Sequence, residues 1–442
     1  MNISEIQNIG FKSQMLDKRI EEIKSKAPIS PLQNEIAPIG SFKQFLYQLN
    51  QPTLYAAEFS INKMLLSNNV KLLIDSNSPA KTPVACICIT TKEDINPAVA
   101  EILNSILYDE SLKINEKNNS SSTTINLNQN FISCNVDANE ADFARLFDSL
   151  CNAISSPNLS EENFNKIKNE IISKKKTEEK TPTQQAMQPF YPSRKLSIED
   201  LSKVTLKDVE NAHTKIMTNS AITVSMSATN EFFKENKVKI IEILEKTLPK
   251  AQVETIQRAK DICQLDKDYR IEGKTTSDHS VVEKFYVLDL DSSVENEVKA
   301  EILTKLLKNR IEKKLSPKGN CEIVVTRSLF AKDGYLEIYL SSKNKQISAL
   351  DMEKYMNDSI QSFYSEPILK EELDIAKKQA VEELKLLYSN SNIRSLSLLE
   401  NYSDGIISIK SINNVLNSFG EKEINELIKS EFSKFSSTCI LS

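Results

Sequence analysis

The chain has 442 residues and a formal net charge of −5, from 56 basic and 61 acidic side chains. The length suits two or three domains with sizeable cores, and the acidic balance gives no support to nucleic-acid binding by bulk electrostatics. Seven scattered glycines exclude a GxGxxG or Walker A loop, and the two histidines, His213 and His279, stand too far apart for a helical HExxH zinc site.

The cysteines and the N-terminal composition indicate a compartment. Seven cysteines without a CxxC pair are typical of a reducing environment. No apolar run approaches the roughly 18 residues of a membrane span, and the first 50 residues lack an apolar signal-peptide core. We therefore expect a cytoplasmic protein without a membrane span, and we interpret residues 1–54 as a polar, weakly ordered leader.

Between residues 55 and 248, strand-like and helix-like patterns alternate. Apolar, β-branched runs predict strands, and apolar residues at three- and four-residue spacing predict helices. The predicted strands are Val70–Asp75, Val84–Thr90, Thr123–Leu127, Phe131–Val136 and Ala221–Ser227. The predicted helices are Pro97–Tyr108, Glu140–Ile154, one beginning at Ser160, and Glu231–Leu248, with capping boxes at Ser197–Asp200 and Thr205–Asp208 opening two more.

Residues 269–442 repeat this order of elements. Strands are predicted at Glu283–Leu290, Cys321–Phe330 and Gly334–Ser341, and helices at Val294–Lys314, Ala349–Ser365 and Lys370–Tyr388. The sequence Ala-Glu-Ile-Leu occurs at Ala100–Leu103 and again at Ala300–Leu303, and a Glu-Glu helix start near residue 160 recurs near 370. The two offsets, 200 and 210 residues, predict two homologous domains, 55–248 and 269–442, joined by a linker at 249–268.

Three segments carry a family resemblance, which covers about residues 62–442. They are Lys63–Asp75, with Asn69 where glycine is usual, Leu196–Val209 followed by His213 and Ala221–Ser227, and Glu371–Lys377. In order and spacing they resemble the insulinase and mitochondrial-processing-peptidase family of zinc metallopeptidases, in the pitrilysin clan. The resemblance implies an α+β fold: two α/β-roll domains, each a mixed, largely antiparallel sheet with helices on one face, that form a clamshell.

The resemblance also places the family's zinc site on this chain. The family carries His-x-x-Glu-His on a helix and a glutamate on a later helix. Aligned on the helix that ends at Tyr108, these positions hold Glu101, Asn104 and Ser105, and the distant glutamate falls at Glu170. Asparagine cannot serve as the general base and serine is a poor zinc ligand. We therefore expect no catalytic residue and no metal ligand here, and a solvated helix face at Glu101 and Glu170.

Two further family features map onto the chain. The arginine and tyrosine that the family places in its second half would fall near Ser316 and at Cys321, so both are absent. The family binds extended peptides by adding a strand to a sheet edge. By resemblance that edge lies at Ser121, Ser122, Thr123, Thr124, Ile125 and Asn126.

These features predict a pseudoenzyme. The leading hypothesis is a non-catalytic processing-peptidase-like protein that binds peptide or completes the chamber of a zinc-bearing partner. It would act as a heterodimer with that partner or as a homodimer, would bind unstructured peptides but no nucleic acid, and would need no cofactor of its own. Two alternatives stay open. One is a structural or assembly subunit without peptide binding. The other is an active hydrolase with an unconventional site, which would need a Cys–His pair using His213 or His279, or a displaced metal site.

Overall fold

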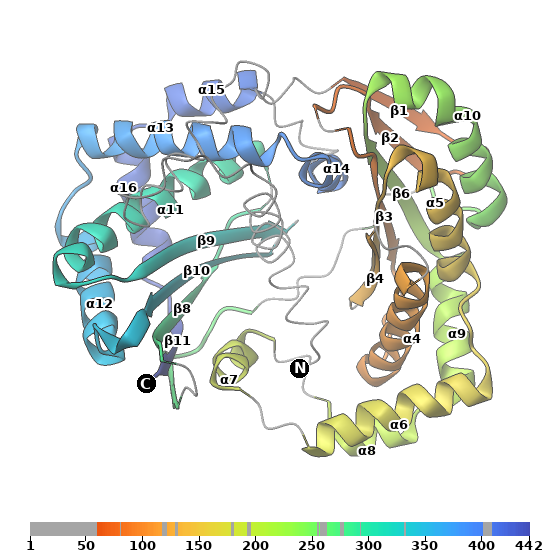
Figure 1. The fold of residues 1–442 in the computed structure, drawn as a ribbon, viewed down its shortest axis with the longest axis horizontal. Coiled ribbons are helices and arrows are strands. Elements are labelled where there is room, and N and C mark those ends of the chain that lie inside the picture. The colour runs from red at the N-terminus through yellow and green to blue at the C-terminus, as the bar shows by residue number, and fades with distance from the viewer. Residues whose placement is uncertain are drawn as a thin grey trace, which may run out of the picture.

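The computed structural model describes residues 60–442, except 80, 117–121, 129–130, 178–180, 192–195, 254–255, 257–262, 275–277, 292, 331–332 and 401–408. The predicted leader and Ser121 lie outside the described residues. The chain forms two units, each a β-sheet with helices, that lie side by side (Figure 1). Along the chain, the strands of the first sheet come before the predicted linker at 249–268, and those of the second sheet come after it.

The first unit is built on a six-stranded sheet with the order β1-β2-β6-β3-β5-β4. Neighbouring strands are antiparallel except β2 and β6, which are parallel. The strands are β1 (Ile61–Leu65), β2 (Lys71–Asp75), β3 (Val84–Thr91), β4 (Ser122–Asn128), β5 (Phe131–Asp137) and β6 (Ser220–Ser227). Every residue of β3 is buried, as its apolar run predicts for a strand covered on both faces.

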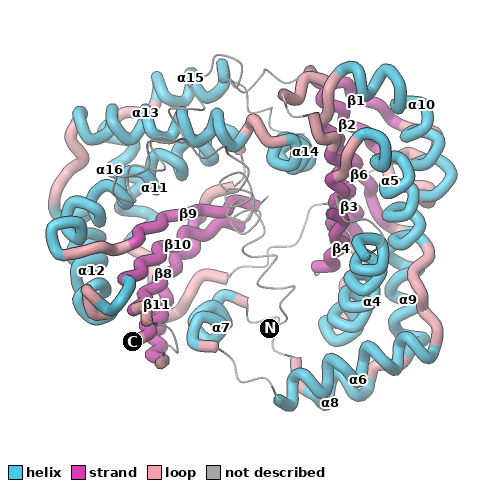
Figure 2. Tube along the Cα trace, in the orientation of Figure 1, coloured by secondary structure: helices cyan, strands magenta, loops and turns pink. Residues whose placement is uncertain are grey.

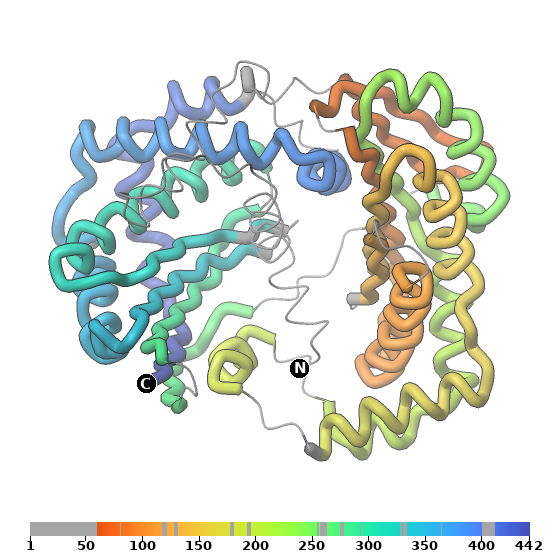
Figure 3. The backbone as a smooth tube through the Cα atoms, in the orientation of Figure 1, coloured from red at the N-terminus to blue at the C-terminus, as the bar shows by residue number. Residues whose placement is uncertain are grey.

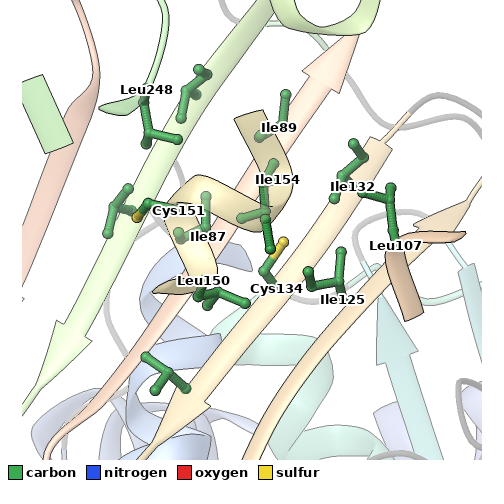
Figure 4. Close-up of a cluster of buried hydrophobic side chains, with 14 of the residues drawn as sticks. Ile87, Ile89, Leu107, Ile125, Ile132, Cys134, Leu150, Cys151, Ile154 and Leu248 are labelled. Carbon is green, nitrogen blue, oxygen red and sulfur yellow. The ribbon is translucent and has the colours of Figure 1, made fainter. Parts of the chain in front are cut away.

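Helices cover one face of this sheet (Figure 2). They are α4 (Pro97–Glu116), α5 (Glu140–Ser155), α6 (Glu161–Thr177), α8 (Ile198–Lys203), α9 (Leu206–Thr218) and α10 (Asn230–Thr247). Figure 4 shows sheet residues such as Ile87, Ile125 and Cys134 among Leu107 of α4 and Leu150 of α5, all of them in one buried cluster. Such burial contributes roughly 25 cal/mol per Å² of apolar surface, so this layer is the core of the unit.

The second unit repeats the plan with a five-stranded sheet, β7-β11-β8-β10-β9. In this sheet the neighbouring strands are antiparallel except β7 and β11, which are parallel. The strands are β7 (Tyr269–Gly273), β8 (Ser280–Leu288), β9 (Glu322–Phe330), β10 (Asp333–Ser342) and β11 (Ser436–Leu441). Its helices are α11 (Val294–Leu315), α12 (Ala349–Ser365), α13 (Lys370–Leu387), α15 (Ile409–Ser418) and α16 (Glu421–Phe432).

Each unit contributes one helix to the other. Helix α14 (Ser391–Glu400), from the second half, packs on β2, β3 and β6 of the first sheet. Helix α7 (Pro182–Met187), from the first half, packs on β7 and β11 of the second sheet. The backbone trace shows both helices on the sheet faces that look toward the opposite unit (Figure 3). The two units therefore share buried surface through an exchange of helices.

The fold class is confirmed: two mixed, largely antiparallel sheets each carry a helical layer. The capping boxes at Ser197 and Thr205 both form. Helix α4 runs eight residues beyond its predicted end at Tyr108, because ion pairs from Lys113 to Asp109 and Glu110, each 2.8 Å, support its polar last turns. Among the described helices, none is long and apolar enough to cross a membrane.

Candidate functional site

Helix α4 carries three of the four positions at which the resemblance places zinc-site residues. Asn96 caps it, since its Oδ1 accepts the N–H of Ala98 at 2.9 Å. The helix face that meets the sheet is buried and apolar: Ile102, Leu103, Ile106 and Leu107. This packing fixes the rotation of the helix, so that Asn104 is buried and Glu101 and Ser105 are partly exposed.

Asn104 and Ser105 both make structural hydrogen bonds. The Oδ1 atom of Asn104, a residue only 5% exposed, accepts the backbone N–H of Leu127 at 2.8 Å. The Ser105 hydroxyl donates to the carbonyl of Glu101 on its own helix at 3.0 Å. An amide cannot take a proton from water at neutral pH. These contacts therefore leave the two positions without the chemistry of a base or of a zinc ligand.

Glu170, the fourth position, is an exposed residue of α6. On the same helix, Lys168 donates from Nζ to the carbonyls of Ser202 and Val204 at 2.8 and 2.7 Å. Within the described part of the chain, no three His, Cys, Asp or Glu side chains gather as ligands for a metal ion. Glu101 and Glu170 alone would bind a hard cation weakly at most.

The predicted peptide-binding edge is strand β4, which ends the first sheet. Thr123 is 1% exposed, and its backbone is held on the side away from β5: its N–H donates to Asn115 Oδ1 at 2.7 Å and its carbonyl accepts from Asn115 Nδ2 at 2.8 Å. Ser122 and Thr124 are partly exposed, whereas Ile125 and Asn126 are buried. Helix α4 thus lies along this edge.

The next two positions are those at which the resemblance places the arginine and the tyrosine of the family's second half. Ser316 is exposed where α11 ends. The Cys321 thiol lies 3.5 Å from the Met352 sulfur, against the helical layer, and burial raises its pKa to about 11. Arg310 is the arginine nearest to Ser316 in the sequence. It makes a bidentate salt bridge with Glu372, with N–O distances of 2.7 and 2.9 Å. Its guanidinium is therefore committed within the second unit.

The two histidines have structural surroundings. His213 is 8% exposed, and its Nε2 lies 2.8 Å from the carbonyl of Ile154, while burial lowers its pKa. His279 is half exposed, with Nδ1 3.2 Å from Ser341 Oγ and Nε2 3.2 Å from Asp278. Each of these three contacts joins a ring nitrogen to an oxygen atom. The hydrolase hypothesis gains no support from this geometry.

A buried polar cluster that sequence reasoning missed joins α14 to the first sheet. The Nε atom of Arg394 donates to Asp75 Oδ2 at 2.6 Å, and both side chains are fully buried. The amide of Asn392 donates to Asp137 Oδ2 at 2.8 Å and accepts from Asn135 Nδ2 at 2.9 Å. Two strands of one unit, β2 and β5, are thereby linked to a helix of the other.

Serines extend the cluster at both ends. Ser395 Oγ donates to the carbonyl of Ser225 at 2.9 Å, and Ser225 Oγ donates to the carbonyl of Ser395 at 2.7 Å. The hydroxyls of Ser78 and Ser391 lie 2.8 Å apart. Two signals were available in the sequence: an arginine among small polar residues at 389–397, and an aspartate at the end of each of two strand-like segments, Asp75 and Asp137. Buried polar groups need partners, but the sequence does not show which ones.

Comparisons with known proteins identify the fold. No protein-family model matches the chain, and no curated protein sequence does. A putative M16-like peptidase from Alicyclobacillus acidocaldarius superposes with a TM-score of 0.66 at 12% identity, covering 87% of this chain and 99% of that one. An inactive M16 peptidase domain from Pseudomonas fluorescens gives 0.62 at 11%, covering 86% and 97%. A chain of complex III from Candida albicans gives 0.64 at 13%, covering 86% and 96%.

These structures share a fold with the chain. The fold is that of the M16-like peptidases, as the resemblance to the insulinase and processing-peptidase family predicts. Identities of 11 to 13% carry the comparison no further than the fold. The chemistry therefore has to be argued from the residues of this chain.

Proposed function

We propose that this chain, with its M16-like peptidase fold, is a non-catalytic protein that completes the chamber of a zinc-bearing relative. The observation that carries the proposal is Asn104. The resemblance assigns Asn104 to the position of the family's general base. The residue is buried, and its side-chain oxygen accepts the Leu127 N–H at 2.8 Å. An amide oxygen held in this way is not basic enough to take a proton from a substrate water.

The proposed partner follows from the same positions. Glu101, Asn104, Ser105 and Glu170 supply neither a base nor a set of zinc ligands, so the chain would bind no zinc of its own and the metal would belong to the partner. We propose a cytoplasmic heterodimer with a zinc-bearing relative, with a homodimer as the other outcome of the test. Unstructured peptides would be the material handled by the assembled chamber.

A structural subunit that contacts no peptide is the second candidate. One observation favours it, namely that the edge expected to receive peptide is engaged by side chains of α4 at Thr123 and Leu127. The complex III neighbour shows this fold within a multi-subunit assembly of that organism. For the present chain such a role is a proposal.

A metal-binding measurement tests the absence of a catalytic site. The purified chain is expected to bind less than about a tenth of an equivalent of zinc and to leave unstructured peptides uncut. The triple variant E101H/N104E/S105H is expected to gain zinc binding, with Glu170 available as the fourth ligand. One equivalent of zinc in the wild type together with peptide cleavage would overturn the proposal. A triple variant that folds without binding zinc would show that the positions are misassigned.

Affinity purification tests the partner. The full chain, tagged and recovered from its own cells, is expected to bring down a relative that retains His-x-x-Glu-His. A chain that elutes alone, at the mass of 49.9 kDa expected for a monomer, would contradict the chamber hypothesis. Recovery within a larger complex that contains no zinc-bearing relative would favour the assembly role.

A further inference from the structure

Helix α4 and strand β4 run side by side in opposite directions. Asn104 of the helix meets Leu127 of the strand, and Asn115 meets Thr123. Eleven residues of helix span about 16 Å, and four residues of strand span about 13 Å. The two asparagines are thus spaced to reach both ends of the described edge strand, each with its amide at the backbone.

The contacts identify which backbone groups of β4 face away from the sheet. In an antiparallel pair, alternate residues direct both backbone groups toward the partner strand. Thr123 directs its N–H and its carbonyl to Asn115, so it belongs to the set that points away from β5. Ile125 and Leu127 follow at intervals of two and belong to the same set, as the Leu127 bond to Asn104 confirms. An added strand would have to pair with this same set.

We propose that Asn104 and Asn115 close the outer edge of β4 against the addition of another strand. The inference rests on the proposed function for its biological meaning, and it deepens that function. With this edge closed, the chain supplies wall to the chamber, and any peptide is held by the partner. The residue that stands in place of the catalytic base becomes a positioning residue for the sheet edge.

The hydrogen bonds account for the closure. An incoming peptide would break three bonds, at the Thr123 N–H, the Thr123 carbonyl and the Leu127 N–H, before it formed equivalent ones. The displaced amide of Asn104 would be left buried without that partner, which is costly. The Thr123 hydroxyl reinforces the closure, since it lies 2.9 Å from Asn115 Oδ1 and 3.2 Å from the Ser111 carbonyl. The addition of a strand would therefore gain little hydrogen-bonding energy and would leave a buried polar group without its partner.

Hydrogen exchange measured by mass spectrometry on the full chain tests the proposal. The probe is a synthetic peptide of alternating valine, threonine and lysine, which favours an extended strand. In the wild type, exchange across residues 122–128 is expected to be the same with and without saturating probe. In N104A/N115A, exchange there is expected to rise about tenfold without the probe and to fall at least threefold when the probe is added.

The matched control is N152A, because Asn152 donates only to the Asp148 carbonyl of its own helix; exchange at 122–128 should not change. The milder N115A replaces the double variant if that does not fold. Probe-dependent protection of 122–128 in the wild type overturns the proposal, as does a folded variant in which exchange and probe binding stay at wild-type values. These readouts use the chain alone, so failure of the proposed partnership would appear separately in the affinity purification.

Discussion

At the scale of single residues, the pair between Arg394 and Asp75 is a contact whose loss should cost several kcal/mol. Both side chains are fully buried, and Asp75 Oδ2 also accepts the Ser227 hydroxyl at 2.9 Å. Removing one partner of a buried pair typically costs about 3–5 kcal/mol, because the other charge is left uncompensated. We predict that R394A lowers the free energy of unfolding by about that amount in urea denaturation.

The control for this prediction is an exposed pair. Arg145 lies 2.8 Å from Asp142, with side chains 57% and 40% exposed, and such pairs contribute about 0.3–0.5 kcal/mol. R145A should therefore change the unfolding free energy only slightly. The double variant D75N/R394M, which leaves no buried charge at this pair, should recover part of the loss. A cost below about 1 kcal/mol for R394A would show that water reaches the site.

His213 gives the molecule a pH dependence of known sign. Burial lowers its pKa below the usual value of 6.5, and the neutral ring donates from Nε2 to the Ile154 carbonyl. The unfolded chain then binds more protons than the folded one below about pH 6.5, so this contribution to stability is present above that pH and is lost as the pH falls. We predict that wild type loses more stability than H213Q between pH 7.5 and 5.5, measured by urea midpoints. Equal losses would place His213 in contact with water.

At single positions the sequence indicates which chemistry a side chain can supply, but not which contacts it makes. Because a proton acceptor needs a lone pair of suitable basicity, the identity of Asn104 predicts that this position supplies no general base. The bond from Asn104 to Leu127 joins residues 23 positions apart, and the pair of Asn392 with Asp137 spans 255. Local patterns do not specify which distant groups meet.

At the scale of elements, apolar periodicity was most reliable where a segment buries one continuous face. Helix α12 was predicted with its observed bounds, and α5 within one residue. Strands β7 and β11 were missed. The cause is visible in β11, which begins with Ser436, Ser437 and Thr438: these polar residues are buried, and Ser437 Oγ donates to the Ala186 carbonyl of α7 at 2.6 Å. Tertiary contact outweighed local composition.

The exchanged helices were the other elements that local patterns did not place. Comparison of the two halves of the sequence predicted two homologous domains, since each half repeats the order of the other. Yet α7 fills an apolar surface on the second sheet, where Met187 packs with Phe285 and Val287, and α14 fills a polar surface on the first. A repeat reveals homologous units, but it does not reveal that they complete each other's cores.

At the scale of the whole molecule, this exchange predicts that the two units unfold together. Without α14 the first sheet would expose buried Asp75 and Asp137, and without α7 the second would expose Phe285 and Val287. Neither sheet then keeps its stability alone. We predict that R394A lowers the urea midpoint of unfolding by the same amount at β3 and at β10. Hydrogen exchange at each strand measures the two midpoints.

The comparison between the two strands separates coupling from a local effect. Arg394 donates to Asp75 and to the Asn77 carbonyl of the first unit, and to the Tyr388 carbonyl in its own half. If the second unit is independent, it should keep its midpoint when the contacts to the first unit are lost. A shift confined to β3 would mean that the units unfold separately and that the clamshell can open with its second half intact. Matching shifts would mean that any separation of the two units must first withdraw α14 from the sheet, because a polar cluster this buried cannot slide without losing its partners.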